Sequence, residues 1–116
     1  MHELSIAMSI VDLAIEEARK ENAKKITEIE IEVGTWAGVD SEAFLFSLNA
    51  TKQYSDVLKD SEIRLIKREP LMYCSGCNRE FTPKVQYTDT CAYCNSAQIE
   101  LIQGRELALS SLSIQE

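Results

Sequence analysis

Residues 26–34 read ITEIEIEVG, and positions 28–33 alternate strictly between acidic and apolar side chains. Successive side chains of a β-strand point to opposite faces of a sheet, so the alternation predicts a strand with one buried and one solvated face. The apolar face carries Ile29, Ile31 and Val33, and the acidic face carries Glu28, Glu30 and Glu32. A surface for a partner protein is the alternative interpretation of the acidic face.

Helical patterns lie on both sides of this strand. Residues 4–21 repeat apolar side chains at the i, i+4, i+7 spacing of an amphipathic helix. The repeating residues are Leu4, Met8, Val11, Ile15 and Ala18. After the strand, Gly34 and Gly38 bracket a turn, and Asp40 suits the N-cap of a second helix over residues 41–54. The strand therefore lies between two helices along the chain.

Two more strands follow. Residues 61–68, SEIRLIKR, form a plausible strand that Pro70 stops. The tail, residues 105–116, alternates weakly, and we interpret it as a strand that returns to the first sheet. The predicted fold class is α+β, with a small sheet of about three strands packed by two helices.

The segment between the last two strands differs from the rest, because it contains turns, aromatic residues and all four cysteines. We interpret it as an inserted zinc-ribbon-like module with two CxxC motifs. The chain then divides into an α+β domain of residues 1–70 plus 104–116 and a zinc-binding domain of residues 71–103.

Charge and hydropathy limit the function classes. The formal net charge of the 116 residues is −7, which argues against broad electrostatic binding to nucleic acid or to an anionic membrane. No apolar run reaches the length of a membrane span, and no basic segment precedes the apolar residues 4–18 as in a secretory signal. We therefore expect a cytoplasmic protein whose thiols stay reduced.

The cysteines form two pairs, Cys74-x-x-Cys77 and Cys91-x-x-Cys94, with thirteen residues between the pairs. A CxxC turn brings two thiolates to one side of an ion, and two such turns complete the tetrahedron of a structural zinc site. Rubredoxin-like iron, an iron–sulfur centre and a redox dithiol remain as alternatives. Four thiolates leave no open coordination position, so zinc is expected to fold the module rather than to catalyse a reaction.

Many zinc ribbons bind nucleic acid, but this one lacks the necessary charge. Phosphate contacts need a basic stripe. Within residues 71–103 the basic residues are Arg79 and Lys84, and acidic residues oppose them. We therefore expect no nucleic-acid binding.

The single histidine, His2, lies beside the amino terminus. The simplest interpretation is an unstructured terminal residue. The alternative is a metal site in which the free amine of Met1, the amide nitrogen of His2 and its imidazole form fused chelate rings. Three nitrogens in a plane suit Ni²⁺ or Cu²⁺.

Four segments together resemble the HypA/HybF family of hydrogenase nickel-incorporation accessory proteins. They are MHELSIAMSIVDLA at residues 1–14, EIEVGTWAGVDSEAFLFS at residues 30–47, the paired CxxC motifs, and IQGRELAL at residues 102–109. The resemblance covers essentially the whole chain. It implies a nickel metallochaperone that works with the GTPase HypB for the hydrogenase large subunit and, in some organisms, with urease accessory proteins.

The resemblance also implies residue roles. Met1 and His2 would hold nickel, and Glu3 would help to position or ligate it. Asp40 matches an acidic position near the nickel end, although a helix N-cap is an equally good role for it. The four cysteines, Cys74, Cys77, Cys91 and Cys94, would hold zinc, which makes residues 1–70 plus 104–116 the nickel-binding domain.

One feature departs from the family. Some members carry histidines next to the cysteine pairs, whereas Asn78 and Asn95 stand there in this chain. A histidine therefore cannot replace a cysteine ligand, and nickel binding at the zinc end is not expected.

The sequence shows no phosphate-binding loop and no histidine-based catalytic set, so we expect no enzyme activity. The competing hypothesis is a zinc-ribbon adapter that binds proteins and carries no nickel.

Overall fold

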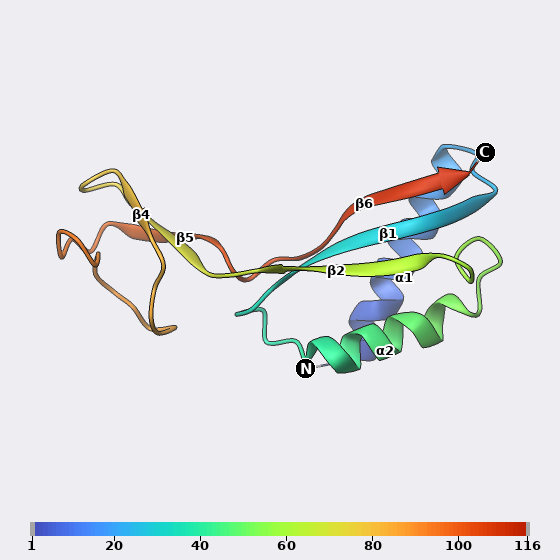
Figure 1. The fold of residues 1–116 in the computed structure, drawn as a ribbon, viewed down its shortest axis with the longest axis horizontal. Helices are drawn as coiled ribbons and strands as arrows, with labels where there is room; N and C mark the ends of the chain where they lie inside the picture. The colour runs from blue at the N-terminus through green and yellow to red at the C-terminus, as the bar shows by residue number, and fades with distance from the viewer. Residues whose placement is uncertain (1, 116) are drawn as a thin grey trace.

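The computed structural model describes residues 2–115, which form two helices and two three-stranded sheets (Figure 1). In chain order the elements are α1 (Glu3–Lys20), β1 (Lys25–Gly34), α2 (Ser41–Lys52), β2 (Glu62–Arg68), β3 (Leu71–Cys74), β4 (Arg79–Phe81), β5 (Ile99–Gln103) and β6 (Leu107–Gln115). The molecule measures 53 × 27 × 16 Å, and its radius of gyration is 17.5 Å. A compact chain of this length would have a radius near 13 Å, so the molecule is elongated.

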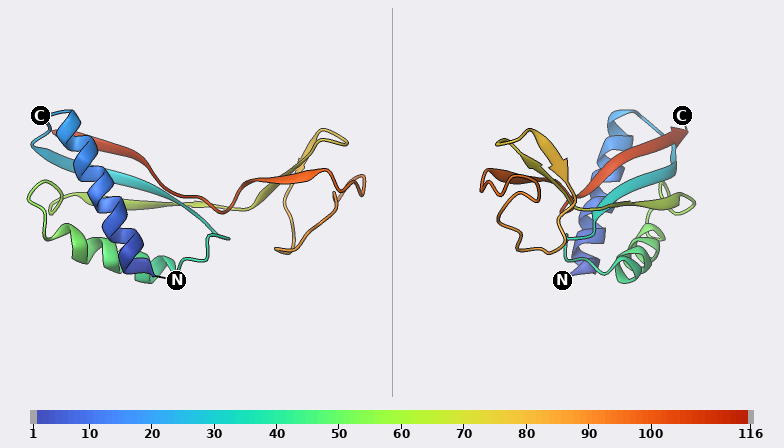
Figure 2. Two further views of the ribbon diagram at one scale, coloured as in Figure 1. Left: turned by 180° about the vertical axis from the view of Figure 1, so that it is seen from behind. Right: turned by 60° about the vertical axis from the view of Figure 1, so that its left-hand side comes forward.

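The larger part, which we call the helix–sheet lobe, contains α1, α2 and the sheet β2-β1-β6. The central strand β1 runs parallel to β2 and antiparallel to β6. Helix α1 packs on α2, β6 and β1, while α2 packs on β2, so both helices cover one face of the sheet (Figure 2). This arrangement confirms the predicted α+β class with a three-stranded sheet and two helices.

The core of this lobe lies between the helices and the sheet. Its largest fully buried side chains are Ile26, Ile29, Ile31, Phe44, Leu48 and Leu58. Ile26 and Ile29 are three positions apart, so simple alternation would place them on opposite faces. The β1–β6 register shifts between Ile26 and Glu28, and this bulge turns Ile26 into the core.

The opposite face of the sheet is polar. Arg64 donates to Glu28 at 2.8 Å and Arg68 donates to Glu32 at 2.7 Å, both from β2 to β1. The hydroxyl of Ser111 donates to Glu30 at 2.7 Å. The three glutamates of β1 are thus engaged by neighbouring strands, as the solvated-face interpretation requires, and each exposed pair contributes at most about 1 kcal/mol.

Three chain segments cross where the helix–sheet lobe meets the rest of the molecule. A Cβ atom on Gly34 would lie 2.2 Å from the backbone of Gly104, and one on Gly104 would lie 2.7 Å from Pro70. The amide of Gly34 donates to the carbonyl of Glu106, and that of Trp36 donates to Gly104, both at 2.7 Å. The absence of side chains at both glycines lets the strands approach closely enough for these bonds.

Substitution of Gly34 by alanine is expected to lower the free energy of unfolding by about 3 kcal/mol or more, because the methyl group forces two backbone segments apart. The matched control is Gly38→Ala, where φ is +76° but no atom lies within 4 Å of the new Cβ. That change should cost only the left-handed backbone strain, about 1 kcal/mol. Urea unfolding measures both, and equal losses would contradict the close-approach explanation.

The smaller part, which we call the cysteine lobe, comprises residues 71–103 and contains the sheet β4-β3-β5. Its buried hydrophobic cluster consists of Met72, Cys74, Phe81 and Cys91, with Cys77, Ile99 and Leu101 packed against them. Pro83 is also buried, so two of the five buried residues are cysteines and the apolar core is very small. The sequence did not predict these individual strands, and the division of the chain into two domains remains a prediction.

Candidate metal centre

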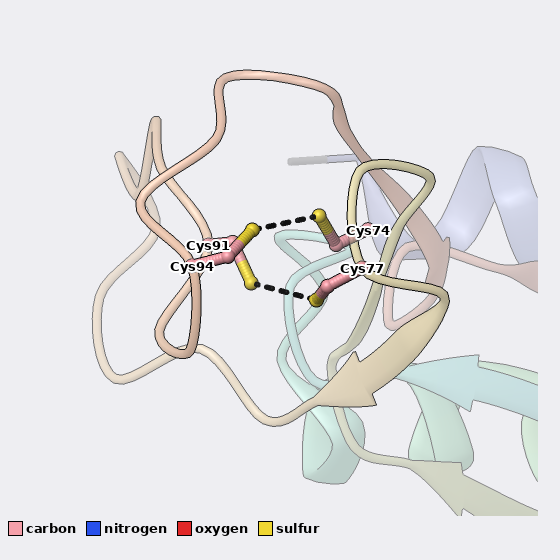
Figure 3. Close-up of side chains that lie close together, drawn as sticks. All are labelled: Cys74, Cys77, Cys91 and Cys94. Carbon is pink, nitrogen blue, oxygen red and sulfur yellow. Dashed lines mark hydrogen bonds between the residues drawn. The ribbon is translucent and has the colours of Figure 1, made fainter.

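Four thiols converge in the cysteine lobe (Figure 3). Cys74 ends β3 and Cys77 lies in the turn before β4, while Cys91 and Cys94 lie in the loop before β5. The Sγ atoms of Cys74 and Cys94 are 3.6 Å apart, those of Cys77 and Cys91 are 3.7 Å apart, and all four lie within 4.8 Å of one another. The two CxxC turns therefore face each other around one point.

This geometry fits a tetrahedral zinc ion. A Zn–S bond of about 2.3 Å gives tetrahedron edges of about 3.8 Å, which matches the closest sulfur pairs. The donor set is all thiolate and closed at four, as in structural zinc sites. No other group of three or more His, Cys, Asp or Glu side chains within residues 2–115 brings its ligand atoms together in this way.

Each CxxC turn is followed by an asparagine with a left-handed backbone: φ is +56° at Asn78 and +64° at Asn95. Asparagine tolerates this conformation better than other residues that carry a side chain. The hydroxyl of Tyr73 also donates to the Asn78 side chain at 2.8 Å. The two asparagines therefore close the turns, a role that the sequence analysis did not assign to them.

In the closed arrangement of the four thiols, the pKa values of Cys77 and Cys91 differ. Burial, together with hydrogen bonds among the thiols, raises the pKa of Cys77 to about 12. At Cys91 burial acts in the same direction, but backbone N–H groups of Cys94 and Tyr93 outweigh it and lower the pKa to about 7. The Tyr93 amide donates to the Cys91 sulfur at 3.3 Å. These backbone donors therefore favour the thiolate form of Cys91, the form that binds a metal ion.

The predicted nickel end lies at the start of α1. His2 is exposed, it is the N-cap residue of α1, and its side chain makes no capping hydrogen bond. Its carbonyl accepts from the Ile6 amide at 3.2 Å, whereas the first four amides of a helix have no partner within the helix. The imidazole and the amide of His2 are thus not needed to hold the helix together. Met1, the other predicted ligand, lies outside the described residues.

The structure brings Glu3 and Asp40 into contact. The Glu3 carboxylate accepts from the backbone amide of Asp40 at 3.2 Å, which ties the start of α1 to the start of α2. The Asp40 carboxylate in turn accepts from Glu42 at 3.0 Å and from Ala43 at 3.3 Å, so it caps α2 as predicted. Asp40 therefore lies beside the start of α1, and one oxygen of its carboxylate, Oδ1, accepts both capping hydrogen bonds.

Comparison with known proteins agrees with this arrangement. A family model described as "Hydrogenase/urease nickel incorporation, metallochaperone, hypA" matches residues 1–114. The chain belongs to the HypA family. The hydrogenase maturation factor HypA of Chlorobium phaeobacteroides is 36% identical over 115 residues, covering 99% of this chain and 100% of the relative. That of Synechococcus elongatus is 35% identical over 115 residues, covering 98% and 99%.

Solved structures of HypA proteins have the same fold. The solution structure of the Ni metallochaperone HypA from Helicobacter pylori matches with a TM-score of 0.73 and 28% identity, covering 99% of this chain and 98% of that one. A second solution structure of a HypA protein matches with a TM-score of 0.76 and 28% identity, covering 98% and 96%. The match extends through both lobes.

Two substitutions separate the capping role of Asp40 from any role near a metal. Asp40→Ala is expected to lower the free energy of unfolding by about 1 kcal/mol, because the amides of Glu42 and Ala43 lose their acceptor. Asp40→Asn keeps an oxygen acceptor and should stay within about 0.5 kcal/mol of the parent. Urea denaturation compares the three proteins, and an Asn variant as unstable as the Ala variant would contradict the cap.

Proposed function

We propose that this chain is a nickel metallochaperone: it carries Ni²⁺ at its amino terminus for the maturation of [NiFe]-hydrogenase and holds a structural zinc ion in the cysteine lobe. The match of the family model to residues 1–114 carries the proposal. The geometry supports it, because the four thiols form a closed set and a transferable ion therefore needs a different site.

In this proposal zinc belongs to Cys74, Cys77, Cys91 and Cys94, and it supplies a cross-link between the two CxxC turns. The thiolates of these cysteines would bind the ion, and Met72 and Phe81 form one buried cluster with Cys74 and Cys91. The cysteine lobe, residues 71–103, then forms the zinc-binding domain, and residues 1–70 plus 104–116 form the nickel-binding domain.

Nickel is cargo, so its site must bind the ion and also release it. The proposed ligands are the amine of Met1, the amide nitrogen of His2 and its imidazole, with Glu3 positioning the group. His2 is exposed, and a partner can therefore replace the ligands one at a time. Amide and imidazole ligation displaces protons, so nickel affinity should fall as the pH drops.

The partners in this proposal are a HypB-type GTPase, the hydrogenase large subunit and, where urease is the recipient, urease accessory proteins. The family description names both hydrogenase and urease nickel incorporation. Among the residues that the structure describes, no helix is long and apolar enough to cross a bilayer. We place the protein in the cytoplasm, without a nucleic-acid or membrane partner and without an enzyme activity of its own.

Native mass spectrometry of the untagged protein, titrated with Ni²⁺, tests the proposal. The expected species carries one zinc and one nickel, and a mild chelator should remove the nickel and leave the zinc. A zinc-loaded protein that takes up no nickel would instead support the adapter hypothesis. A protein purified with iron, or with no metal, would overturn the zinc assignment.

A further inference from the structure

An aromatic residue lies inside the second of the two CxxC turns. We call residues 74–77 the first knuckle and residues 91–94 the second knuckle. Tyr93 is part of the second knuckle, and its backbone amide donates to the Cys91 sulfur at 3.3 Å. Its side chain is 58% exposed, so burial in the core does not explain its position.

The ring of Tyr93 contacts two residues of β4. The guanidinium carbon of Arg79 lies 4.9 Å from the ring centroid, within the range of a cation–π interaction. The ring of Phe81 lies 6.4 Å away at an angle of 86°, which is a favourable edge-to-face pair. Phe81 is 6% exposed and is therefore a fixed support for this contact.

Strand β4 belongs to the half of the lobe that carries the first knuckle. In the ladder between β3 and β4, Arg79 pairs with Cys74 and Phe81 pairs with Met72. The side chain of Tyr93 therefore reaches from the second knuckle to the strand pair that holds the first. This contact joins the same two halves of the site that the metal would join.

The charge of Arg79 suits this position. A zinc ion with four thiolates carries two net negative charges, and the cations within residues 71–103 are Arg79 and Lys84. The ladder pairing places Arg79 directly opposite the ligand Cys74. A guanidinium that stacks on the Tyr93 ring keeps its charge, and the Arg79 residue stays exposed to water.

We propose that Arg79 and Tyr93 form a clasp that keeps the two knuckles closed and slows the exchange of the zinc ion. The inference rests on the zinc assignment proposed above. Zinc leaves only after its thiolates are displaced, and a movement of the second knuckle carries both Cys91 and Cys94 away from the first pair. That movement separates the Tyr93 ring from Arg79 and Phe81. The clasp thus gives a protein that handles nickel a kinetic barrier against losing its zinc.

Zinc release to an excess of the chelator 4-(2-pyridylazo)resorcinol measures the clasp directly. All proteins are first checked by native mass spectrometry to contain one zinc ion. Arg79→Ala should release zinc about two to five times faster than the parent, because one exposed cation–π contact is lost. Tyr93→Ala loses both ring contacts and should release it about ten times faster or more.

Conservative variants distinguish the clasp from a general loss of structure. Tyr93→Phe keeps the ring and should stay within about twofold of the parent, and Arg79→Lys should lie between the parent and Arg79→Ala. Lys84→Ala, which removes the other exposed cation of the lobe, should leave the rate unchanged. Iodoacetamide labelling should become faster at Cys91 and Cys94 in the Arg79→Ala protein.

The outcomes separate this inference from the function on which it rests. A parent protein without zinc would overturn the zinc assignment itself. A zinc-loaded Arg79→Ala protein that releases the ion at the parent rate would overturn the clasp and leave the zinc site intact. An effect of Lys84→Ala as large as that of Arg79→Ala would also overturn the clasp, because net charge would then explain the rates.

Discussion

Replacement of Cys74 by serine is expected to abolish zinc binding and to unfold residues 71–103, while the helix–sheet lobe remains folded. Cys74 is completely buried and ends β3, so its loss removes one of four ligands at the centre of the lobe. Structural zinc contributes about 10–16 kcal/mol to the folding of small zinc-finger peptides near neutral pH. The effect should therefore exceed that of any single apolar substitution in the lobe.

The small core of the cysteine lobe explains why the loss cannot be tolerated. Its buried apolar residues other than cysteines are Met72, Phe81 and Pro83, with Ile99 and Leu101 partly buried. A segment of this size does not bury enough apolar surface to fold without a metal or another cross-link. The helix–sheet lobe has its own cluster of buried residues and does not depend on zinc in this way.

Two-dimensional ¹H–¹⁵N NMR spectra test this prediction residue by residue. In the Cys74→Ser protein, amide signals of residues 71–103 should collapse to the dispersion of an unfolded chain, whereas those of β1 should stay in place. Ala92→Ser is the matched control, because it introduces a serine at an exposed position of the second knuckle without removing a ligand. Dispersed signals for residues 71–103 in the zinc-free variant would contradict a metal-dependent fold.

Much of the helix–sheet lobe was predictable because its signals are local. The alternation of residues 28–33 gave β1, and the position of Asp40 gave the start of α2. The return of residues 107–115 to the first sheet was also predicted, because their weak alternation matches a strand with one buried face. For β1 and β6, the alternation of the side chains matches the two-residue period of a β-strand.

Other features depend on contacts between distant segments, and the sequence alone did not reveal them. The approach of Gly34 to Gly104 joins residues 70 positions apart, and no local pattern marks it. The bond between Glu3 and the Asp40 amide likewise depends on how α1 and α2 pack. A signal did exist for Asn78 and Asn95, since asparagine directly after each CxxC motif indicates a left-handed turn.

The two candidate metal sites also differ in how far the local sequence predicted them. Cysteine spacing predicted a four-thiol centre, and the structure brings all four sulfurs together. The amino-terminal site was predicted from backbone chemistry and from resemblance, and the two carboxylates that resemblance added are engaged with backbone amides. The nickel ligands therefore stay a proposal that needs a direct measurement.

Substitution of His2 by alanine is expected to remove nickel binding and to leave zinc binding and stability unchanged. The imidazole is one of three proposed nitrogen ligands. Loss of a group that only hydrogen-bonds to a metal ligand already lowers metal affinity about 10- to 100-fold. Loss of a direct ligand should therefore weaken Ni²⁺ binding by more than about a hundredfold. The side chain is exposed and makes no capping hydrogen bond, so its removal should leave the free energy of unfolding nearly unchanged.

A second variant tests whether the terminal amine takes part. Addition of Gly-Ser before Met1 keeps His2 but moves the free amine away from it, so the fused chelate rings can no longer form. Both proteins should lose nickel in calorimetric titrations, and both should retain one zinc. Glu3→Gln tests the role of Glu3, because an amide oxygen can still accept from the Asp40 amide while the negative charge is removed. Unchanged nickel binding would support a positioning role, and weaker binding would support a role as ligand.

The pattern of results across these variants identifies the nickel ligands. Loss in both His2→Ala and the extended protein supports the amine–amide–imidazole set. Loss in His2→Ala alone would show that the imidazole binds without the amine. Nickel binding that survives both changes would place the cargo site elsewhere. Within residues 2–115, the four thiols would then be the remaining group with converging ligand atoms, and nickel would have to compete with zinc for them.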